Sequence, residues 1–523
     1  MTTQEPVTTQ EAAPTPELGQ TWPSLEGFRA RAPHARVIPV VRRLLAEVTP
    51  VGLYRALADG RPGTFVLESA ESDGTWGRWS FVGVAARATL TSQDGRACWT
   101  GDVPVGVPTD GDVMEVLRQT LRVLATPVEP GLPPLTGGLV GALGWDVVRH
   151  WEPTLPADAP DELDVPELTL LLATDLAAVD HADGSVWLIA NAVNTDGTDE
   201  RVDEAWADAV ARLDTMQRAL LDAPALAPMV IDEDVAEPEV SFRSTREQFE
   251  TAVRAGLDAI VEGEVFQVVL SQRADLDCPA APLDVYRVLR TLNPSPYMYY
   301  VQLDDDLAVV GSSPETLVKV HDRRAETFPI AGSRPRGATP EADLELAAEL
   351  LADPKERAEH VMLVDLARND LAKVCEPGTV EVVDLMAVRR FSHIMHICST
   401  VVGHLRPDAT ATDALVATFP AGTLSGAPKP RAIALIDQLE PARRGIYGGA
   451  VGYLDFAGNM DTAIAIRTAL IRAGRAHVQA GAGVVADSVP ATEWAEVRAK
   501  AAAAVRAVRR AARLRAVTGT DGG

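Results

Sequence analysis

Cysteine is scarce in this chain of 523 residues, which contains only Cys98, Cys278, Cys375 and Cys398. None of the four forms a Cys-x-x-Cys pair or stands at a zinc-ligand spacing. The sequence therefore predicts neither a disulfide framework nor a structural zinc site.

Long apolar runs are also lacking. The amino terminus, MTTQEPVTTQEAAPTPE, contains neither the basic nor the apolar region of a signal peptide. The best candidate for a membrane span, residues 168–179, is interrupted by Asp175 and is too short to cross a bilayer. We therefore expect a cytoplasmic protein with no membrane partner.

Positive charge is in deficit, with 48 Lys and Arg against 74 Asp and Glu and a net charge of −26. Such a surface repels phosphate backbones and anionic lipids, which argues against a nucleic-acid partner. An anionic substrate would need a local cationic pocket. Neither a P-loop nor a dinucleotide-binding fingerprint is present.

Composition divides the chain into five parts. The first residues are rich in Thr, Pro, Gln and Glu, and an acidic, proline-rich stretch lies near the middle. We expect a disordered tail at 1–20, an amino-terminal domain at 21–221, a linker at 222–241, a second domain at 242–512 and a flexible tail at 513–523.

Local patterns within these parts indicate an α+β fold with antiparallel strands. Asp183-Gly184 predicts a hairpin turn, and Thr245 with Gln248 forms a capping box at the start of a helix. Further helices are expected at 202–220, 341–374, 410–417, 428–439 and 490–512. β-rich stretches, with strands separated by turns such as Ala457-Gly458-Asn459, are expected at 264–276, 297–303, 307–320, 394–404, 446–472 and 476–485.

Two Glu-x-x-Glu pairs, Glu356/Glu359 and Glu493/Glu496, fall in expected helices. A spacing of three places both carboxylates of a pair on one helix face, and two such faces would offer four ligands to a hard cation such as Mg²⁺. The alternative is a solvated face with ion pairs, for instance Glu496 with Lys500, and the spacing by itself favours this alternative.

Four features within apolar strands are candidates for a site. Arg467 needs an anionic partner, either internal or bound, because it cannot be neutralised. His396 and Gln267 are either hydrogen-bonded core residues or face a ligand. Residues 481–483 (Gly-Ala-Gly) permit a ligand to approach the backbone, or simply permit tight packing.

Taken together and in this order, ten segments strongly resemble the chorismate-binding enzymes, and anthranilate synthase component I in particular. They are GEVFQVVLSQR (263–273), NPSPYMYY (293–300), GSSPE (311–315), PIAGSRPRG (329–337), DPKERAEHVMLVDLARND (353–370), HIMHICS (393–399), PAGTLSGAPK (420–429), GIYGGAVGY (445–453), IRT (466–468) and AGAGVVADS (480–488). The amino-terminal part resembles the same family at 65–83 and 137–152. The resemblance implies a two-sheet antiparallel β-sandwich surrounded by helices, with 242–512 as the chorismate-binding catalytic domain.

The resemblance also implies residue roles. Glu359 and Glu496 resemble direct Mg²⁺ ligands, while Glu356 and Glu493 resemble ligands that act through water. The implied substrate site comprises Gly332, Ser333, Thr423, Tyr447, Arg467, Gly481, Ala482, Gly483 and Lys500. Its cations, with Mg²⁺, would hold the dianion chorismate inside an acidic protein.

Glu315 and His396 resemble the acid/base residues that assist loss of the 4-hydroxyl group of chorismate. Gln267 occupies the position of a water-activating lysine in isochorismate- and salicylate-forming members, and Ala331 that of a nucleophilic lysine in aminodeoxychorismate synthases. Lacking both lysines, the site should leave position 2 of the ring to ammonia. Ser333 departs from the family's usual threonine, and GSSPE from the usual GASPE.

The resemblance implies a magnesium-dependent lyase of tryptophan biosynthesis that makes anthranilate. Ammonia would come from a separate glutamine amidotransferase subunit in a heterotetramer, since no segment for that activity is recognisable. Two rivals are an enzyme that stops at the aminated intermediate and an idle, tryptophan-binding regulatory subunit.

Feedback inhibition by tryptophan is the last implied property. The residues that resemble its site are Glu68, Ser69, Pro296, Tyr297 and Met298. The alternative is that NPSPYMYY is merely a turn followed by a core strand.

Overall fold

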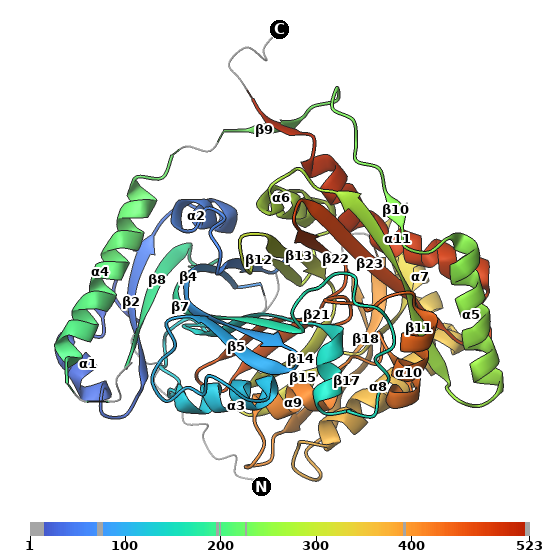
Figure 1. Cartoon of the computed structure of the whole chain (residues 1–523), viewed down its shortest axis with the longest axis horizontal. Helices are drawn as coiled ribbons and strands as arrows, with labels where there is room; N and C mark the ends of the chain where they lie inside the picture. The colour runs from blue at the N-terminus through green and yellow to red at the C-terminus, as the bar shows by residue number, and fades with distance from the viewer. Residues whose placement is uncertain are drawn as a thin grey trace.

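The computed structural model describes residues 15–70, 77–194, 198, 200–224, 227–390 and 394–517. Within them, hydrogen bonds join 22 strands into one sheet whose named pairings are all antiparallel, and β9 (Met229–Ile231) pairs with β24 (Leu514–Ala516) in a small second sheet. Helices surround the large sheet (Figure 1). The α+β class and the antiparallel sheet are thus confirmed, whereas two separate sheets are not.

Long, bulged strands explain this continuity. β4 (Trp79–Gln93) pairs with β3 (Thr64–Glu68), β5 (Arg96–Gly101) and β7 (Leu168–Asp180), with three register shifts along β7. β18 (Ile394–His404) similarly pairs with β15 (Arg324–Thr327), β16 (Ile330–Pro335) and β17 (Glu381–Arg390). Because a bulge bends its strand, one strand can carry the hydrogen bonding from one layer into the next.

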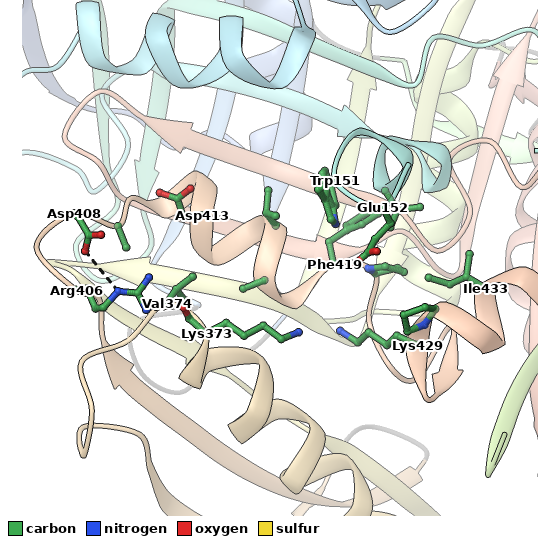
Figure 2. Close-up of a pocket in the computed structure, with 16 residues that line it drawn as sticks. Trp151, Glu152, Lys373, Val374, Arg406, Asp408, Asp413, Phe419, Lys429 and Ile433 are labelled. Carbon is green, nitrogen blue, oxygen red and sulfur yellow. Dashed lines mark hydrogen bonds and ion pairs between the residues drawn. The ribbon is translucent and has the colours of Figure 1, made fainter. Parts of the chain in front are cut away.

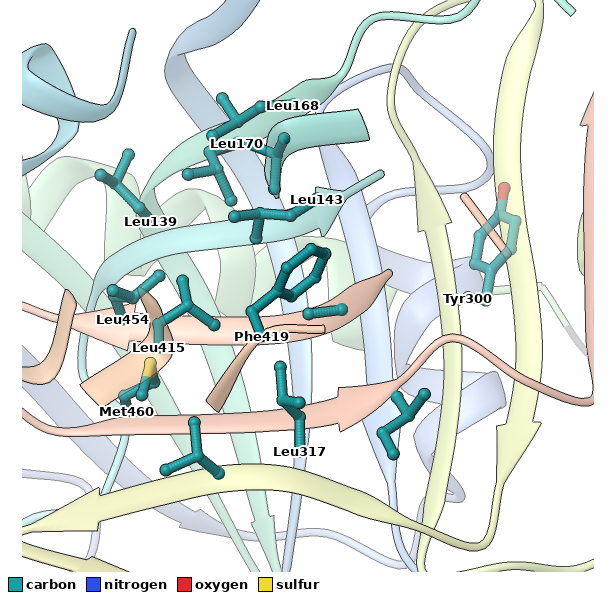
Figure 3. Close-up of a cluster of buried hydrophobic side chains, with 14 of the residues drawn as sticks. Leu139, Leu143, Leu168, Leu170, Tyr300, Leu317, Leu415, Phe419, Leu454 and Met460 are labelled. Carbon is teal, nitrogen blue, oxygen red and sulfur yellow. The ribbon is translucent and has the colours of Figure 1, made fainter. Parts of the chain in front are cut away.

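Two strand pairings join the amino-terminal and carboxy-terminal halves. β3 pairs with β12 (Tyr297–Gln302), and β6 (Gly138–Leu143) pairs with β20 (Ala450–Asp455). Leu139 and Leu143 of β6 and Leu454 of β20 lie in one buried cluster with Leu317 and Phe419 (Figure 3). Both halves therefore build one core, and residues 513–517 and 229–232 are tied together by the small sheet.

Helices cover the sheet on several sides (Figure 1). α1 (Leu25–Arg31) and α4 (Val202–Leu221) lie at one side, with α4 against β2 (Val37–Leu45) and β8 (Ser185–Val193). α5 (Arg246–Val261), α10 (Lys429–Leu439) and α11 (Pro490–Ala511) pack against β11 (Gln267–Asp277) or β23 (Arg475–Val484). The remaining helices are α2 (Pro50–Leu57), α3 (Val113–Val123), η1 (Trp145–His150), α6 (Pro282–Leu292), α7 (Pro340–Ala352), α8 (Pro354–Ala372) and α9 (Ala411–Thr418).

Local sequence signals agree closely with these elements. The capping box of Thr245 and Gln248 is formed at the start of α5, and the Asp183-Gly184 turn connects β7 to β8. The helical stretch expected at 341–374 contains two helices, because Asp353 ends α7 and caps α8, with Pro354 at the first position of α8.

The other strands complete the sheet: β1 (Thr21–Trp22), β10 (Ser241–Phe242), β13 (Leu307–Ser313), β14 (Thr316–His321), β19 (Gly426–Ala427), β21 (Met460–Ile464) and β22 (Thr468–Arg472). No helix in the described part of the chain is long and apolar enough to cross a membrane. The tail segments 1–14 and 518–523 lie outside the described residues.

Candidate active site

Arg467 stands in the connection between β21 and β22 with φ of +53°. Its Nη1 lies 3.5 Å from the side-chain oxygen of Asn293, and no ion pair with a carboxylate is found for it among the described residues. Desolvation lowers its pKa, yet a guanidinium stays charged in a protein. Of the two partners expected for Arg467, an internal carboxylate is not found in the described chain, so the arrangement favours a bound anion.

Gly481 and Gly483 of β23 leave room for the side chains of two other candidate residues. A Cβ on Gly481 would lie 2.7 Å from the hydroxyl of Tyr447, and a Cβ on Gly483 would lie 2.6 Å from Nε2 of Gln267. Any larger residue would displace these side chains. Gly481 and Gly483 project to the same face of the strand, with Ala482 on the other, so the two absent side chains leave room for Tyr447 and Gln267 on a common face.

Glu315 connects β13 to β14, and its Oε1 accepts a 2.8 Å hydrogen bond from the Thr423 hydroxyl. Burial raises the pKa of this carboxyl to about 7, against the opposing effects of Thr423 and of the positive charge of Lys500. Near neutral pH the group is thus divided between its acid and its carboxylate, as a general acid requires.

His396 lies on β18, with Nδ1 2.8 Å from the carbonyl oxygen of Gly332. A carbonyl only accepts, so Nδ1 carries the proton in the neutral ring and Nε2 keeps a basic lone pair. Burial lowers the pKa of His396, and Arg467 lowers it further. Gly332 has φ of +64° at a bulge in β16, and the neighbouring Ser333 is exposed.

Electrostatic coupling links the candidate residues in two groups. Lys500 affects the pKa of Glu315, Glu315 affects that of Tyr447, and Arg467 affects that of His396. Nζ of Lys500 also donates to the carbonyl of Gly481 at 3.1 Å. Glu315 and Lys500, which are 185 positions apart in the sequence, are thus brought near one another by the fold.

The four glutamates lie on α8 and α11. Burial raises the pKa of Glu359 and of Glu493, and the negative charge of Glu496 raises both further. Glu496 pairs with Lys500 at 2.7 Å, the ion pair that the sequence offered as an alternative, and Glu356 lies 3.5 Å from Arg334. No three acidic, His or Cys side chains of the described residues are arranged as a metal site.

The residues expected to bind an inhibitor lie at the contact between β3 and β12. Met298 is the β-ladder partner of Glu68, and the backbone of Ala70, next to Ser69, donates to Ser295 at 3.0 Å. Glu68 is already bonded to Arg290 at 2.8 Å and to the Tyr286 hydroxyl.

Tyr297 and Met298 belong to two different hydrophobic clusters, because consecutive strand residues face opposite sides. The Tyr297 hydroxyl lies 2.9 Å from Asp461. The side chains of Tyr297 and Met298 therefore lie on opposite sides of β12, and all five residues stay candidates for the inhibitor site.

A buried ion pair that the sequence did not reveal supports Tyr447. Arg444 bonds to Glu440 at 2.6 Å, and its guanidinium lies over the rings of Trp145, at 4.2 Å, and Tyr447, at 5.4 Å. Glu440 also accepts from the Ser271 hydroxyl at 2.7 Å. The i,i+4 spacing of the pair resembles an ordinary surface ion pair, so no sequence signal distinguishes it.

Comparison with known proteins identifies the relatives of this chain. The profile of the chorismate binding enzymes matches residues 64–506. The chain is 57% identical over 510 residues to anthranilate synthase component 1 of Arthrobacter globiformis, covering 96% of each chain. The chain belongs to the anthranilate synthase component 1 family. The chain is also 55% identical to anthranilate synthase component 1 of Mycolicibacterium smegmatis, and the alignment covers 94% of each protein.

Solved structures of related proteins share the fold. Anthranilate synthase component I of Streptococcus pneumoniae superimposes with a TM-score of 0.71 at 34% identity, covering 84% of this chain and 94% of that one. A menaquinone-specific isochorismate synthase of Escherichia coli reaches a TM-score of 0.68 at 20% identity, covering 92% and 98%, which shows the fold alone.

Proposed function

We propose that this chain converts chorismate and ammonia to anthranilate and pyruvate through 2-amino-2-deoxyisochorismate, in the first step of tryptophan biosynthesis. The observation that carries the proposal is Arg467, a partly buried cation without a carboxylate partner in the described chain, which influences His396 at the same site. Membership of the anthranilate synthase component 1 family supports it.

Substrate binding uses the cations and the backbone of the site. Arg467, the Tyr447 hydroxyl and the backbone of 481–483 bind the enolpyruvyl carboxylate, while Gly332, Ser333, Thr423 and Lys500 surround the ring. Desolvated charge-assisted hydrogen bonds of this kind orient a dianion strongly. They also compensate Arg467, whose charge costs free energy while it is unpaired.

The amination step follows from the acid and from what the site lacks. Ammonia forms a bond to C2, the ring double bonds shift, and the C4–O bond breaks while Glu315 supplies the proton that makes the leaving group water. Neither Gln267 nor Ala331 carries an amine that could attack the ring or activate water, so neither position competes with ammonia. In the second step C2 loses a proton and the bond from C3 to the enolpyruvyl oxygen breaks. Neutral His396 contributes acid/base chemistry through Nε2.

The proposal includes Mg²⁺. The four glutamates suit this cation chemically. Glu359 and Glu493 are partly desolvated and are repelled by Glu496, so a bound divalent cation would offset both the desolvation and the repulsion. Glu359 and Glu496 would bind it directly and Glu356 and Glu493 through water. The ion would polarise a substrate carboxylate.

Two further parts of the proposal concern regulation and assembly. A separate glutaminase supplies ammonia in a heterotetramer, consistent with the component 1 name of the relatives. Tryptophan inhibits by binding at the contact between β3 and β12, where Ser69, Pro296 and Met298 lie close to Glu68.

The decisive experiment supplies the purified chain with chorismate, Mg²⁺ and an ammonium salt, and follows anthranilate by fluorescence. We expect product with ammonium and none with glutamine. Accumulation of the aminated intermediate would instead identify an enzyme that stops at that intermediate. If no chorismate is consumed, the protein is the catalytically idle, tryptophan-binding regulatory subunit.

A further inference from the structure

A pocket of about 510 Å³ lies outside the candidate active site, between the end of η1, helix α9, the end of α8 and the start of α10. Figure 2 shows its lining side chains. None of the residues proposed to bind chorismate, Mg²⁺ or tryptophan lines it. Its volume is within the range of small-molecule sites, roughly 300–1,000 Å³.

One wall of this pocket is apolar and aromatic. The rings of Trp151 and Phe419 meet edge to face with centroids 5.7 Å apart. Val148, Val416 and Ile433 extend the same lining. Rigid rings and branched side chains of this kind offer contact area to a flat, apolar ligand.

The floor of the pocket carries two ammonium groups that point toward one another (Figure 2). Lys373 and Lys429 both hold Asp370, at 3.0 and 2.6 Å, and Lys429 also donates to the carbonyl of Thr418 at 3.0 Å. An ammonium has three N–H groups. These bonds use one donor of Lys373 and two of Lys429, so further donors remain for an anion.

Three acidic residues line the pocket: Glu152, beside Trp151 at the aromatic wall, and Asp408 and Asp413. The last two oppose an anion less than their number suggests. Asp413 is occupied by the Thr410 hydroxyl and backbone at 2.8 Å each, and the side chain of Asp408 is 80% exposed at 3.5 Å from Arg406. Water screens such exposed charges. Lys429, in contrast, is only 12% exposed.

We propose that this pocket is a second ligand site, for a flat aromatic carboxylate. The ring would lie against Trp151 and Phe419, and the carboxylate would accept from Lys373 and Lys429. In a chain of net charge −26, two ammonium groups beside an aromatic wall form a specific anion receptor.

The residues that hold Lys373 and Lys429 also border the candidate active site. Asp370 and Thr418 line a smaller cavity of about 60 Å³ together with Glu315 and Thr423. An anion bound to the remaining donor of Lys429 therefore shifts the ammonium group that holds Asp370 and Thr418, and so alters the segment 418–423, which holds Glu315 through Thr423. Through this coupling, which rests on the proposed function, the ligand lowers turnover without occupying the substrate site.

The test titrates the full chain with 2-naphthoate, and with uncharged 2-naphthylmethanol as the matched ligand, by calorimetry. We expect saturable 1:1 binding of 2-naphthoate, weakened at least tenfold by Lys373→Gln and by Trp151→Leu. Arg368→Gln, which removes the same charge from an exposed site on the same helix, should leave binding unchanged. So should Arg467→Gln.

Steady-state kinetics give the second readout. Bound 2-naphthoate should lower kcat and leave KM for chorismate unchanged. Competition with chorismate, loss of binding in Arg467→Gln, equal binding of 2-naphthylmethanol, or no saturable binding would each overturn the proposal. Binding is measured without turnover, so it stands or falls separately from the proposed reaction.

Discussion

Glu315 and Arg467 show how burial is used at the scale of single residues. Each is an ionisable group whose charged form is destabilised by its surroundings, and desolvation is the first cause of both pKa shifts. For the carboxyl, the result is a proton available near pH 7. For the guanidinium, which cannot release its proton, the result is a site that requires an anion.

The pH dependence of turnover should follow Glu315. Its pKa of about 7 predicts that kcat/KM for chorismate falls as the pH rises through that value, because the acid form is needed. Glu315→Gln should lose activity at every pH. A wild-type profile that is flat between pH 6 and 9 would contradict the assignment.

The same shift predicts a change in stability. A carboxyl whose pKa is higher in the folded than in the unfolded chain loses stabilisation as the pH rises from its unfolded pKa, near 4.3, to about 7. Glu315→Gln should therefore be more stable than wild type at pH 8 by roughly 1–3 kcal/mol, but not at pH 4. Thermal unfolding at both pH values measures the difference.

Arg467→Met should separate stability from binding. Replacing this partly buried cation, which has no carboxylate partner among the described residues, by an apolar side chain should raise Tm, whereas chorismate binding should weaken by roughly a hundredfold or more. Chorismate should raise the Tm of wild type but not of the variant. If the variant is instead strongly destabilised, Arg467 has an internal role that its 3.5 Å contact with Asn293 does not reveal.

At the scale of elements, α8 and α11 matter because each contributes two of the glutamates to one region. The like charges on the two helices make this contact costly in the absence of a cation, as the raised pKa values of Glu359 and Glu493 indicate. Helix spacing accounts for each pair, while the meeting of the pairs depends on packing against β16, β18 and β23.

Mg²⁺ should therefore stabilise these helices. We expect Mg²⁺ to raise the Tm of wild type, and Glu359→Gln and Glu496→Gln each to remove that increase together with turnover. In EDTA, Glu359→Gln should unfold at or above the wild-type temperature, since like-charge repulsion is relieved. Asp365→Asn, on the exposed face of α8, is the matched control and should behave as wild type.

At the scale of the whole molecule, the contact between β3 and β12 joins the two halves beside the proposed tryptophan site. A ligand bound there can change activity only if it binds two arrangements of the halves with different affinity. Glu68 already has partners in Arg290 and Tyr286, so binding an amino acid would require this cluster to rearrange or to serve as its support.

Ser69→Ala should desensitise the protein to tryptophan. Loss of a hydrogen bond to a charged head group weakens binding by roughly ten- to a hundredfold, and uninhibited turnover should stay the same. The measurement is turnover against rising tryptophan for both proteins. Equal inhibition of the two would place tryptophan elsewhere, and an uninhibited wild type would end the regulatory proposal.

Local sequence patterns were enough to predict many of the elements and the chemistry of the candidate residues. The capping box at Thr245, the hairpin at Asp183-Gly184 and the bounds of β18 are local properties, set by hydrogen bonds and periodicity within a few residues. The motif order also predicted the family that the comparisons confirm.

How distant segments meet depends on the packing of the whole chain and could not be read from local patterns. That 22 of the described strands form one continuous sheet, that the buried Arg444 packs against the Tyr447 ring, and that residues 229–231 pair with 514–516 depend on contacts between distant segments. Burial is likewise a property of the packed whole. A free-standing Glu315 and a free-standing Glu496 have the same chemistry, and it is the surrounding protein that raises the pKa of Glu315 to about 7.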